Sequence, residues 1–417
     1  MSYLQDSHQG ADEQCTKLTN GTRAHNRANS VVTVLTAIAP KLPIVLVENE
    51  RVTKVVSDIS TSVIGPVFRA KNFPENVSRG MLDLLRELTE ISPSNKLLKK
   101  DIYDAFNDAK FFHTPLPILT EAWIPILAQW IQSDKERIPE LLARLTAPTT
   151  AGIMFGVGAA STRQEADRKT QLTLKRIALL ILASPEDSFT LNIPQILEKI
   201  IELVSATPAS SPSSITRADI TVLLRAIILK TSPVHLSTFW PVVNGELTSA
   251  LSSLLPGATS KEHYNNAGII QACKLLDELV VLNPDDFQLM EWLFVTDTID
   301  AVYKPSTPPS ILSLTDEINE ILSISSSALP APIGTRGEPD ADEPRRRLFL
   351  DPLVEALEEE EGAAVLEMTR GELIDRLVRP FLGDLAMNAF EARYKGGEAD
   401  WQCVWKSVVK DAGSSEY

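Results

Sequence analysis

Cysteine, histidine and glycine are scarce in this chain of 417 residues, which contains 3 Cys, 5 His and 18 Gly. The cysteines are odd in number and far apart, so the sequence offers neither a disulfide framework nor paired metal-ligand spacing. They are Cys15, Cys273 and Cys403. No histidine has a second His, Cys or carboxylate at the spacing of a zinc site. We therefore expect no metal, no cofactor and a reducing compartment.

Basic residues are outnumbered, with 40 Lys and Arg against 55 Asp and Glu and a formal net charge of -15. Affinity for phosphate backbones comes mainly from clustered Lys and Arg, so this balance argues against nucleic-acid binding. Long apolar runs are also missing. The best candidates, Ile153 to Ala160 and Ile177 to Ala183, fall far short of the roughly 20 residues that cross a bilayer. Because the N-terminus does not resemble a signal peptide, we expect a cytoplasmic protein whose membrane role is peripheral.

Sequence signatures of catalysis are lacking as well. The glycine cluster Gly152 to Gly158 has neither a preceding strand nor the Lys-Ser/Thr of a phosphate-binding loop. We interpret it as a segment of close helix packing or a bend. No nucleophile elbow and no Cys–His pairing with a local signature is found, so no enzymatic activity is supported. A hydrolase or transferase would require a deep polar pocket with convergent titratable groups.

What the sequence does contain is a helical period. From Ser30, apolar residues recur every three or four positions for nearly three hundred residues. Pro40 and Pro43 are expected to break the first helix, and Gly65-Pro66 to end the second. Helix pairs recur about every 40 residues, which favours an all-α fold, an irregular HEAT/armadillo-like helical repeat array (α-solenoid). A compact globular helical domain is the alternative.

Changes in composition divide the chain into four segments. Residues 1–29 are polar and are predicted to be a disordered tail, and residues 30–324 are predicted to form the helical repeat array. Residues 325–347, rich in Pro, Gly and acidic residues, are predicted to be a linker. Residues 348–417 are predicted to form a small carboxy-terminal helical unit that can fold back on the array.

The segment Asn283 to Phe294 is the most distinctive in the chain. An aspartate is expected to cap a helix whose buried stripe consists of its two phenylalanines and Met290. Packing explains most of this pattern, but Trp292 is predicted to lie at the margin of the stripe. If its ring is exposed, three residues become candidate partner contacts: Trp292, Asp297 and Asp300.

Three consecutive arginines precede the apolar sequence Leu-Phe-Leu. Such a combination can hold an anionic membrane surface at roughly 1 kcal/mol per basic residue. Acidic residues come immediately before the arginines, which favours a solvated linker with locally paired charges. Direct binding of anionic phospholipid stays the alternative function, with three candidate contacts: Arg345, Arg346 and Arg347.

Three stretches resemble the carboxy-terminal region of the Dopey family. The first is Gln271-Ala-Cys-Lys-Leu-Leu-Asp-Glu-Leu, continuing through Asn-Pro-Asp-Asp-Phe-Gln-Leu to Asp300. The others are Asn95 to Phe112 and Leu174 to Ala183, so the resemblance covers roughly residues 78–303. It implies a non-enzymatic cytosolic scaffold, peripheral on Golgi and endosome membranes, that acts in vesicle traffic. The implied partners are a large Sec7-related helical scaffold protein and a phospholipid flippase.

Overall fold

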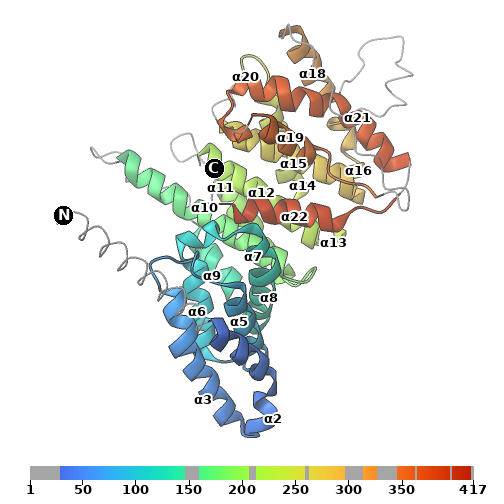
Figure 1. The fold of residues 1–417 in the computed structure, drawn as a ribbon. Coiled ribbons are helices and arrows are strands. Elements are labelled where there is room, and N and C mark those ends of the chain that lie inside the picture. Colours follow the sequence, from blue (N-terminus) through green and yellow to red (C-terminus); the bar gives the residue numbers. More distant parts are fainter. Residues whose placement is uncertain are drawn as a thin grey trace, which may run out of the picture. The chain divides into compact units, whose positions relative to one another are not determined.

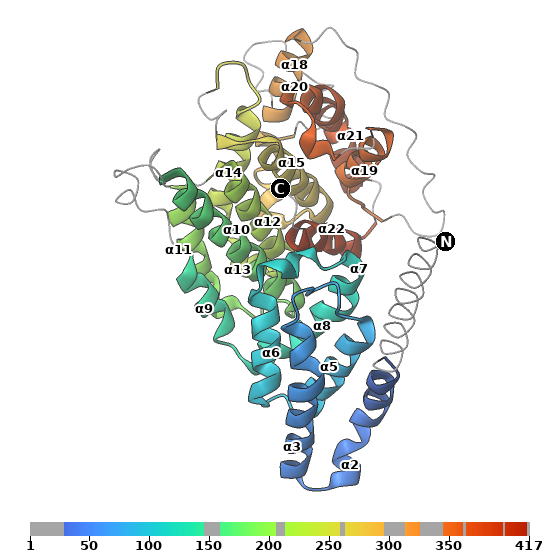
Figure 2. The same cartoon turned by 60° about the vertical axis from the view of Figure 1, so that its left-hand side comes forward.

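The computed structural model describes residues 29–145, 159–205, 213–258, 263–295, 313–325, 345–361, 364–394 and 397–414. Within these ranges every regular element is helical, and the isolated bridge between Arg346 and Ala399 is the single strand-like pairing. This confirms the all-α class and the helical array predicted from the apolar period. The chain divides into two compact units, residues 1–135 and 136–417 (Figures 1 and 2). The predicted tail up to residue 28, the glycine cluster and most of the predicted linker lie outside the described residues.

The first unit is a set of short helices around an aromatic core. After a helix at residues 29–38 its elements are η1 (Ala39–Lys41), α2 (Leu42–Leu46), α3 (Asn49–Ile59), η2 (Ser60–Ile64), α4 (Gly65–Phe68), α5 (Arg79–Ile91), α6 (Lys96–Asn107), η3 (Ala109–His113), α7 (Leu116–Ile118), η4 (Leu119–Trp123) and α8 (Ile124–Ser133). The buried ring of Trp123 lies at its centre, with ring centroids 5.6 Å from Phe68 and 5.1 Å from Phe111. Aromatic pairs at such distances add stabilisation beyond area burial.

Prolines inside helical runs follow π-helical turns. Pro66, Pro125 and Pro380 each occupy the second position after such a turn, namely after η2, η4 and η10 (Ile374–Val378). A proline lacks the N–H group and its ring clashes with the carbonyl four residues earlier, so a wider turn relieves the conflict. The prediction that Gly65-Pro66 ends a helix is therefore wrong, because α4 continues through it to Phe68.

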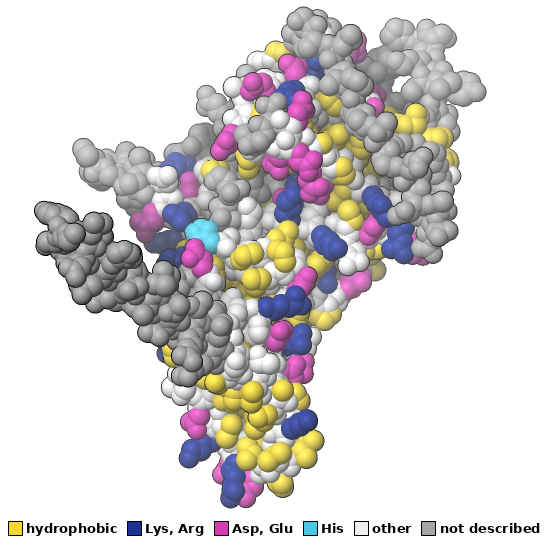
Figure 3. Space-filling view, in the orientation of Figure 1, with side chains coloured by type: hydrophobic (Ala, Val, Ile, Leu, Met, Phe, Trp, Pro, Cys, Tyr) yellow, Lys and Arg dark blue, Asp and Glu magenta, His cyan; other side chains and the backbone are white. Residues whose placement is uncertain are grey.

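The stretch Asn29–Leu46 also departs from prediction. Pro40 and Pro43 lie in the first turns of η1 and α2, positions that tolerate proline, and the helical run continues past both. The 18 residues are long and apolar enough, by length and composition alone, to cross a membrane, and only 11% of the stretch is buried. The expectation that no apolar stretch reaches this length is therefore wrong. Figure 3 shows hydrophobic side chains gathered over this end of the first unit.

The second unit contains the longer helices. Its elements are α9 (Arg137–Arg144), α10 (Ala159–Ala183), η6 (Thr190–Asn192), α11 (Ile193–Val204), α12 (Ser214–Lys230), α13 (Pro233–Leu236), α14 (Trp240–Ser252), α15 (Asn266–Leu282), α16 (Asp285–Gln288), η8 (Glu291–Leu293), α18 (Leu314–Ser325), α19 (Leu350–Glu361), η9 (Val365–Glu367), α20 (Arg370–Leu373), η10, α21 (Arg379–Tyr394) and α22 (Trp401–Gly413). α12 packs between α10 and α15, and both α12 and α15 are buried along almost their whole length.

The last helix belongs to the centre of this unit. α22 contacts both α10 and α12, and both views of the ribbon place it beside them (Figures 1 and 2). Trp405 donates a hydrogen bond from its indole N–H to the carbonyl of Leu182 at 3.3 Å. The ammonium of Lys175 donates to the carbonyl of Ser414 at 2.7 Å, which satisfies a carbonyl just past the helix end. Residues far apart in sequence thus share one core.

Candidate partner-binding surface

The ring of Trp292 is exposed, which is the condition that makes it a candidate partner contact. In η8, 55% of the surface of Trp292 is accessible, and Leu289 and Leu293 are 75% and 41% exposed. We call Leu289, Trp292 and Leu293 the Trp292 patch. The two other candidate contacts, Asp297 and Asp300, lie outside the described residues.

The helix predicted around the patch is interrupted. α16 ends at Gln288, and η8 begins only after an intervening turn. Phe287 and Phe294 are buried as predicted, and Phe287 stacks on Trp240 with ring centroids 6.3 Å apart. The residues of the Trp292 patch would lie on the face away from the two phenylalanines even in a continuous helix. With the break they are likewise exposed to solvent.

Polar contacts hold this exposed turn against α14 and α21. The indole N–H of Trp240 donates to Oδ2 of Asp286 at 2.8 Å, and Glu291 forms an ion pair with Arg393. The indole N–H of Trp292 donates to the carbonyl of Leu289 at 3.1 Å. Because the polar atom of the Trp292 ring is already satisfied, the patch offers apolar surface on a fixed support. Such aromatic anchors carry much of the binding energy at protein interfaces.

The three arginines that are candidate lipid contacts lie next to α22. The carbonyl of Arg346 accepts from the N–H of Asp400 at 2.9 Å, and the third arginine lies 3.5 Å from a carboxylate oxygen of the same residue. The first and third arginines are exposed. Leu348 and Leu350, which follow them, are buried. These leucines are therefore engaged in the core and not available at the surface beside the arginines.

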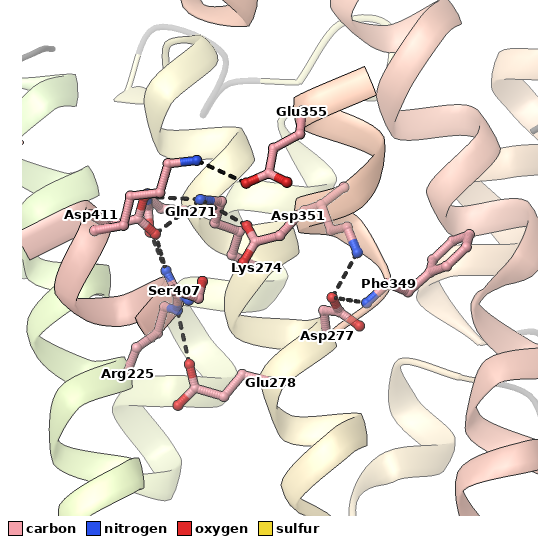
Figure 4. Close-up of polar contacts among 12 residues, drawn as sticks. Arg225, Gln271, Lys274, Asp277, Glu278, Phe349, Asp351, Glu355, Ser407 and Asp411 are labelled. Carbon is pink, nitrogen blue, oxygen red and sulfur yellow. Dashed lines mark hydrogen bonds and ion pairs between the residues drawn. The ribbon is translucent and has the colours of Figure 1, made fainter. Parts of the chain in front are cut away.

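A cluster of buried charges joins α22 to α12 and α15 (Figure 4). The fully buried Arg225 on α12 donates from Nε to Oε2 of Glu278 at 2.9 Å, and from Nη1 to Oδ2 of Asp411 at 2.5 Å. It also donates to Oε1 of Gln271 and Oγ of Ser407, both at 2.9 Å. One guanidinium therefore cross-links three helices through its rigid fork of donors.

The cluster extends to α19 through two further residues of α15. The ammonium of Lys274 lies 2.9 Å from Oδ1 of Asp411 and 3.1 Å from Oδ1 of Asp351. Asp277 accepts from the backbone N–H groups of Phe349 and Leu350, both at 2.8 Å. These N–H groups stand at the start of α19, where a helix has no internal acceptors for them. Asp277 therefore caps α19 from another helix.

The carboxylates of this cluster have opposite titration shifts. Burial raises the pKa of Glu278 to about 7, against the opposing attraction of Arg225. Burial likewise raises the pKa of Asp277 to about 7, although two backbone N–H groups favour its charged form. Burial also opposes the ionisation of Asp411, but Lys274 and Arg225 outweigh it and lower its pKa to about 2. The charged form is therefore favoured at Asp411 and disfavoured at Asp277 and Glu278.

Sequence reasoning did not identify this cluster, although a signal was present. Arg225, Lys274, Asp277 and Glu278 stand inside helices that are otherwise apolar on most faces. Side chains in such helices cannot all reach water, and buried charges require partners. Charged residues in an all-round apolar helix therefore predict an internal ion-pair network, whose partners the sequence alone does not name.

Replacing Asp277 with alanine is expected to release the start of α19. Two N–H groups would lose their acceptor, one of them on the buried Leu350, at a cost of about 1–3 kcal/mol in local stability. Hydrogen exchange of the amides in residues 349–354 measures this directly. Glu359→Ala, an exposed change on the same helix, is the control and should leave those rates unchanged. Equal protection in the two variants would show that the cap contributes nothing.

No reaction centre is assembled by these residues. In the ranges that the structure covers, no group of three or more His, Cys, Asp or Glu side chains is arranged to hold a metal ion. Burial raises the pKa of the Cys273 thiol to about 12, so this thiol stays protonated and unreactive at neutral pH. The charged cluster is internal and its groups pair with one another, so its chemistry is structural.

The fold and its surfaces define a helical-repeat protein that presents apolar surface on rigidly held turns. A family model described as DOP1 C-terminal matches residues 2–395. The chain belongs to this family, the Dopey (DOP1) family. The match extends well beyond residues 78–303, where the resemblance in sequence was found.

The known relatives are much longer than this chain. It is 43% identical over 387 residues to Protein dop1 of Emericella nidulans, which covers 92% of this chain and 20% of that protein. It is 28% identical over 208 residues to Protein DOP1 of Saccharomyces cerevisiae, covering 48% of this chain and 12% of the yeast protein. Protein pad-1 of Caenorhabditis elegans is 25% identical to this chain over 266 residues, which covers 60% of this chain and 10% of pad-1. No solved structure matches the chain.

Proposed function

We propose that this chain acts in a non-enzymatic scaffold of membrane traffic between the Golgi apparatus and endosomes. The proposed partner is a large Sec7-related helical scaffold protein, with a phospholipid flippase as a second partner, on the cytoplasmic surface of both membranes. The observation that carries the proposal is the Trp292 patch, an apolar surface on a fixed turn. Membership of the Dopey family supports the assignment to traffic.

The surroundings of the patch favour a protein partner. Tyr394, a second exposed aromatic residue, follows Arg393, whose side chain pairs with Glu291 beside Trp292. Asp285 is exposed two turns earlier in the same segment. Interfaces typically combine aromatic anchors at the centre with a polar, solvent-accessible rim. The complementary surface is therefore expected to be apolar at its centre and basic at its edge.

Trp292→Ala is expected to weaken binding to the purified Sec7-related scaffold about 30-fold, because a central aromatic anchor contributes on the order of 2 kcal/mol. Calorimetric titration of the full chain with that partner measures the change. Trp401→Ala is a matched control, since Trp401 is also in the second unit and is 53% exposed, close to the 55% of Trp292. The control should leave the affinity unchanged.

Two outcomes would argue against this assignment. Unchanged affinity of the Trp292 variant would place the contact elsewhere on the chain. Flotation of the chain with anionic vesicles, lost when Arg345, Arg346 and Arg347 are replaced together, would instead support direct recognition of phospholipid. Either result can be separated from misfolding by comparing the thermal unfolding of each variant with that of the Trp401 control.

A further inference from the structure

A second apolar surface covers one end of the first unit, and the proposed function does not use it. Figure 3 shows hydrophobic side chains gathered over α2 and the residues around it. Six large aliphatic side chains there are 46–80% exposed: Val31, Val34, Ile38, Ile44, Val45 and Val47. We call these six residues the tip surface. Exposed apolar patches on soluble folds mark sites of interaction.

The helix at residues 29–38 has two apolar stripes. Val32 and, just after the helix, Ala39 are buried, and η1 contacts α5, so one side already packs within the unit. A second stripe, at an angle to the first, has the i, i+3, i+7 spacing of a helix–helix seam: Val31, Val34 and Ile38. An apolar face wide enough to include both stripes is normally covered by more than one neighbour.

The threonines of this stretch form their hydrogen bonds within the helix. The hydroxyls of Thr33 and Thr36 donate to backbone carbonyls one turn earlier, both at 2.9 Å. Lys41 is the sole charged residue between Asn29 and Val47. Beyond it, Glu48 and Arg51 form an ion pair at 2.7 Å. An anionic lipid surface selects clusters of Lys and Arg, which the tip surface lacks.

The turn between α2 and α3 contains Val47 in a strained backbone conformation that leaves its side chain exposed. Val47 has φ 59° and ψ -43°, a backbone conformation that β-branched residues rarely adopt. Its side chain is the most exposed of the tip surface, at 80%. Strain of this kind costs on the order of 1–3 kcal/mol and persists mainly where it serves a function. Here it keeps valine at the edge of the surface, beside Ile44 and Val45.

We propose that the tip surface receives an amphipathic helix from the part of a Dopey-family chain that lies outside this sequence. The present chain covers 20% of Protein dop1, so the remaining four-fifths of that protein is an ample source of such a helix. In a helical repeat array each helix pair buries its apolar faces against neighbours on both sides. Use of Asn29–Leu46 as a membrane span would require Val32 and Ala39 to leave the unit in which they are buried.

The test uses the full chain and purified fragments of Emericella nidulans dop1 that lie outside the matched region. The double variant Val34→Glu with Ile38→Glu should weaken binding of the cognate fragment about tenfold or more, because it places two charges in an apolar seam. Leu191→Glu is the control, since Leu191 is an aliphatic residue 94% exposed in the second unit. The Leu191→Glu variant should bind the fragment with unchanged affinity. The Trp292→Ala variant should also bind the fragment with unchanged affinity.

Crosslinking keeps the test decisive if the double variant folds poorly. A photoreactive amino acid at position 38 should capture the fragment at residues spaced three or four apart, as expected for a helix. Concentration-dependent dimers of the chain that the double variant abolishes would overturn the proposal in favour of a second copy. Binding of the tip surface to neutral phosphatidylcholine vesicles, or to none of the fragments, would overturn it as well.

Discussion

Arg225→Ala is expected to lower the free energy of unfolding of the second unit by about 3–5 kcal/mol. The guanidinium is fully buried and donates to Glu278, Asp411, Gln271 and Ser407, so its removal leaves several buried groups without their donor. Lys274 would then be the remaining ion-pair partner of Asp411 in the cluster, with Lys175 as a further nearby cation. Hydrogen exchange of the α12 and α15 amides, followed by mass spectrometry, reports on this unit separately from the first.

The matched control is Lys410→Ala, which breaks the ion pair with Glu355 at 3.2 Å on the surface of the same unit. An exposed pair of this kind is worth at most about 1 kcal/mol. Arg225→Met retains apolar packing in place of the arginine stem and so separates lost packing from lost charge. If Arg225→Ala cost no more than the control, the network would contribute nothing to the stability of the unit.

Stability of the second unit is expected to rise as the pH falls from 8 to 5. Burial raises the pKa of Asp219, on α12, to about 7, although Lys175 opposes the shift. The ammonium of Lys175 lies 3.7 Å from Oδ1 of Asp219. Between the ordinary pKa near 4 and the folded value, the unfolded chain is ionised while the native state holds the proton. The native state therefore binds more protons, and stability falls as pH rises through this window.

The size of the effect follows from the width of the window. Each pH unit inside it changes the stability by about 1.4 kcal/mol, so Asp219 contributes at most about 3 kcal/mol between pH 5 and 7. Glu278 and Asp277 act in the same direction, whereas the stability that ionised Asp411 contributes is lost as the pH falls from about 4 to about 2. Asp219→Asn removes one titration and should flatten the measured profile. If stability depended on pH as steeply or more steeply in that variant, the pH dependence would not come from Asp219.

The apolar period predicted helices well wherever a helix buries one face. α19 (Leu350–Glu361) and α22 (Trp401–Gly413) lie within residues 348–417, where helices were predicted. The period failed at prolines, because a π-helical turn such as η2 lets a helix continue through Pro66. Such a turn depends on local geometry that no spacing of apolar residues encodes.

The candidate surface was only partly predictable for a different reason. The spacing of the two phenylalanines placed Trp292 at the margin of the buried stripe, which identified the residue. The break between α16 and η8 was not predicted, and the segment is held by contacts from distant helices, such as the hydrogen bond from Trp240 to Asp286 across 46 positions. The partners of Arg225 include Asp411, 186 positions later. A sequence read along its length does not show which helices meet.

The position of α22 has a genetic consequence. A nonsense codon anywhere between residues 345 and 400 would remove Asp411 and Ser407, and would leave the cations of α12 and α15 buried without their main partners. It would also expose the surfaces of α10 and α12 that α22 covers. Such an allele would destabilise the whole second unit and not only its last helix. Its product would be a substrate for quality-control proteolysis.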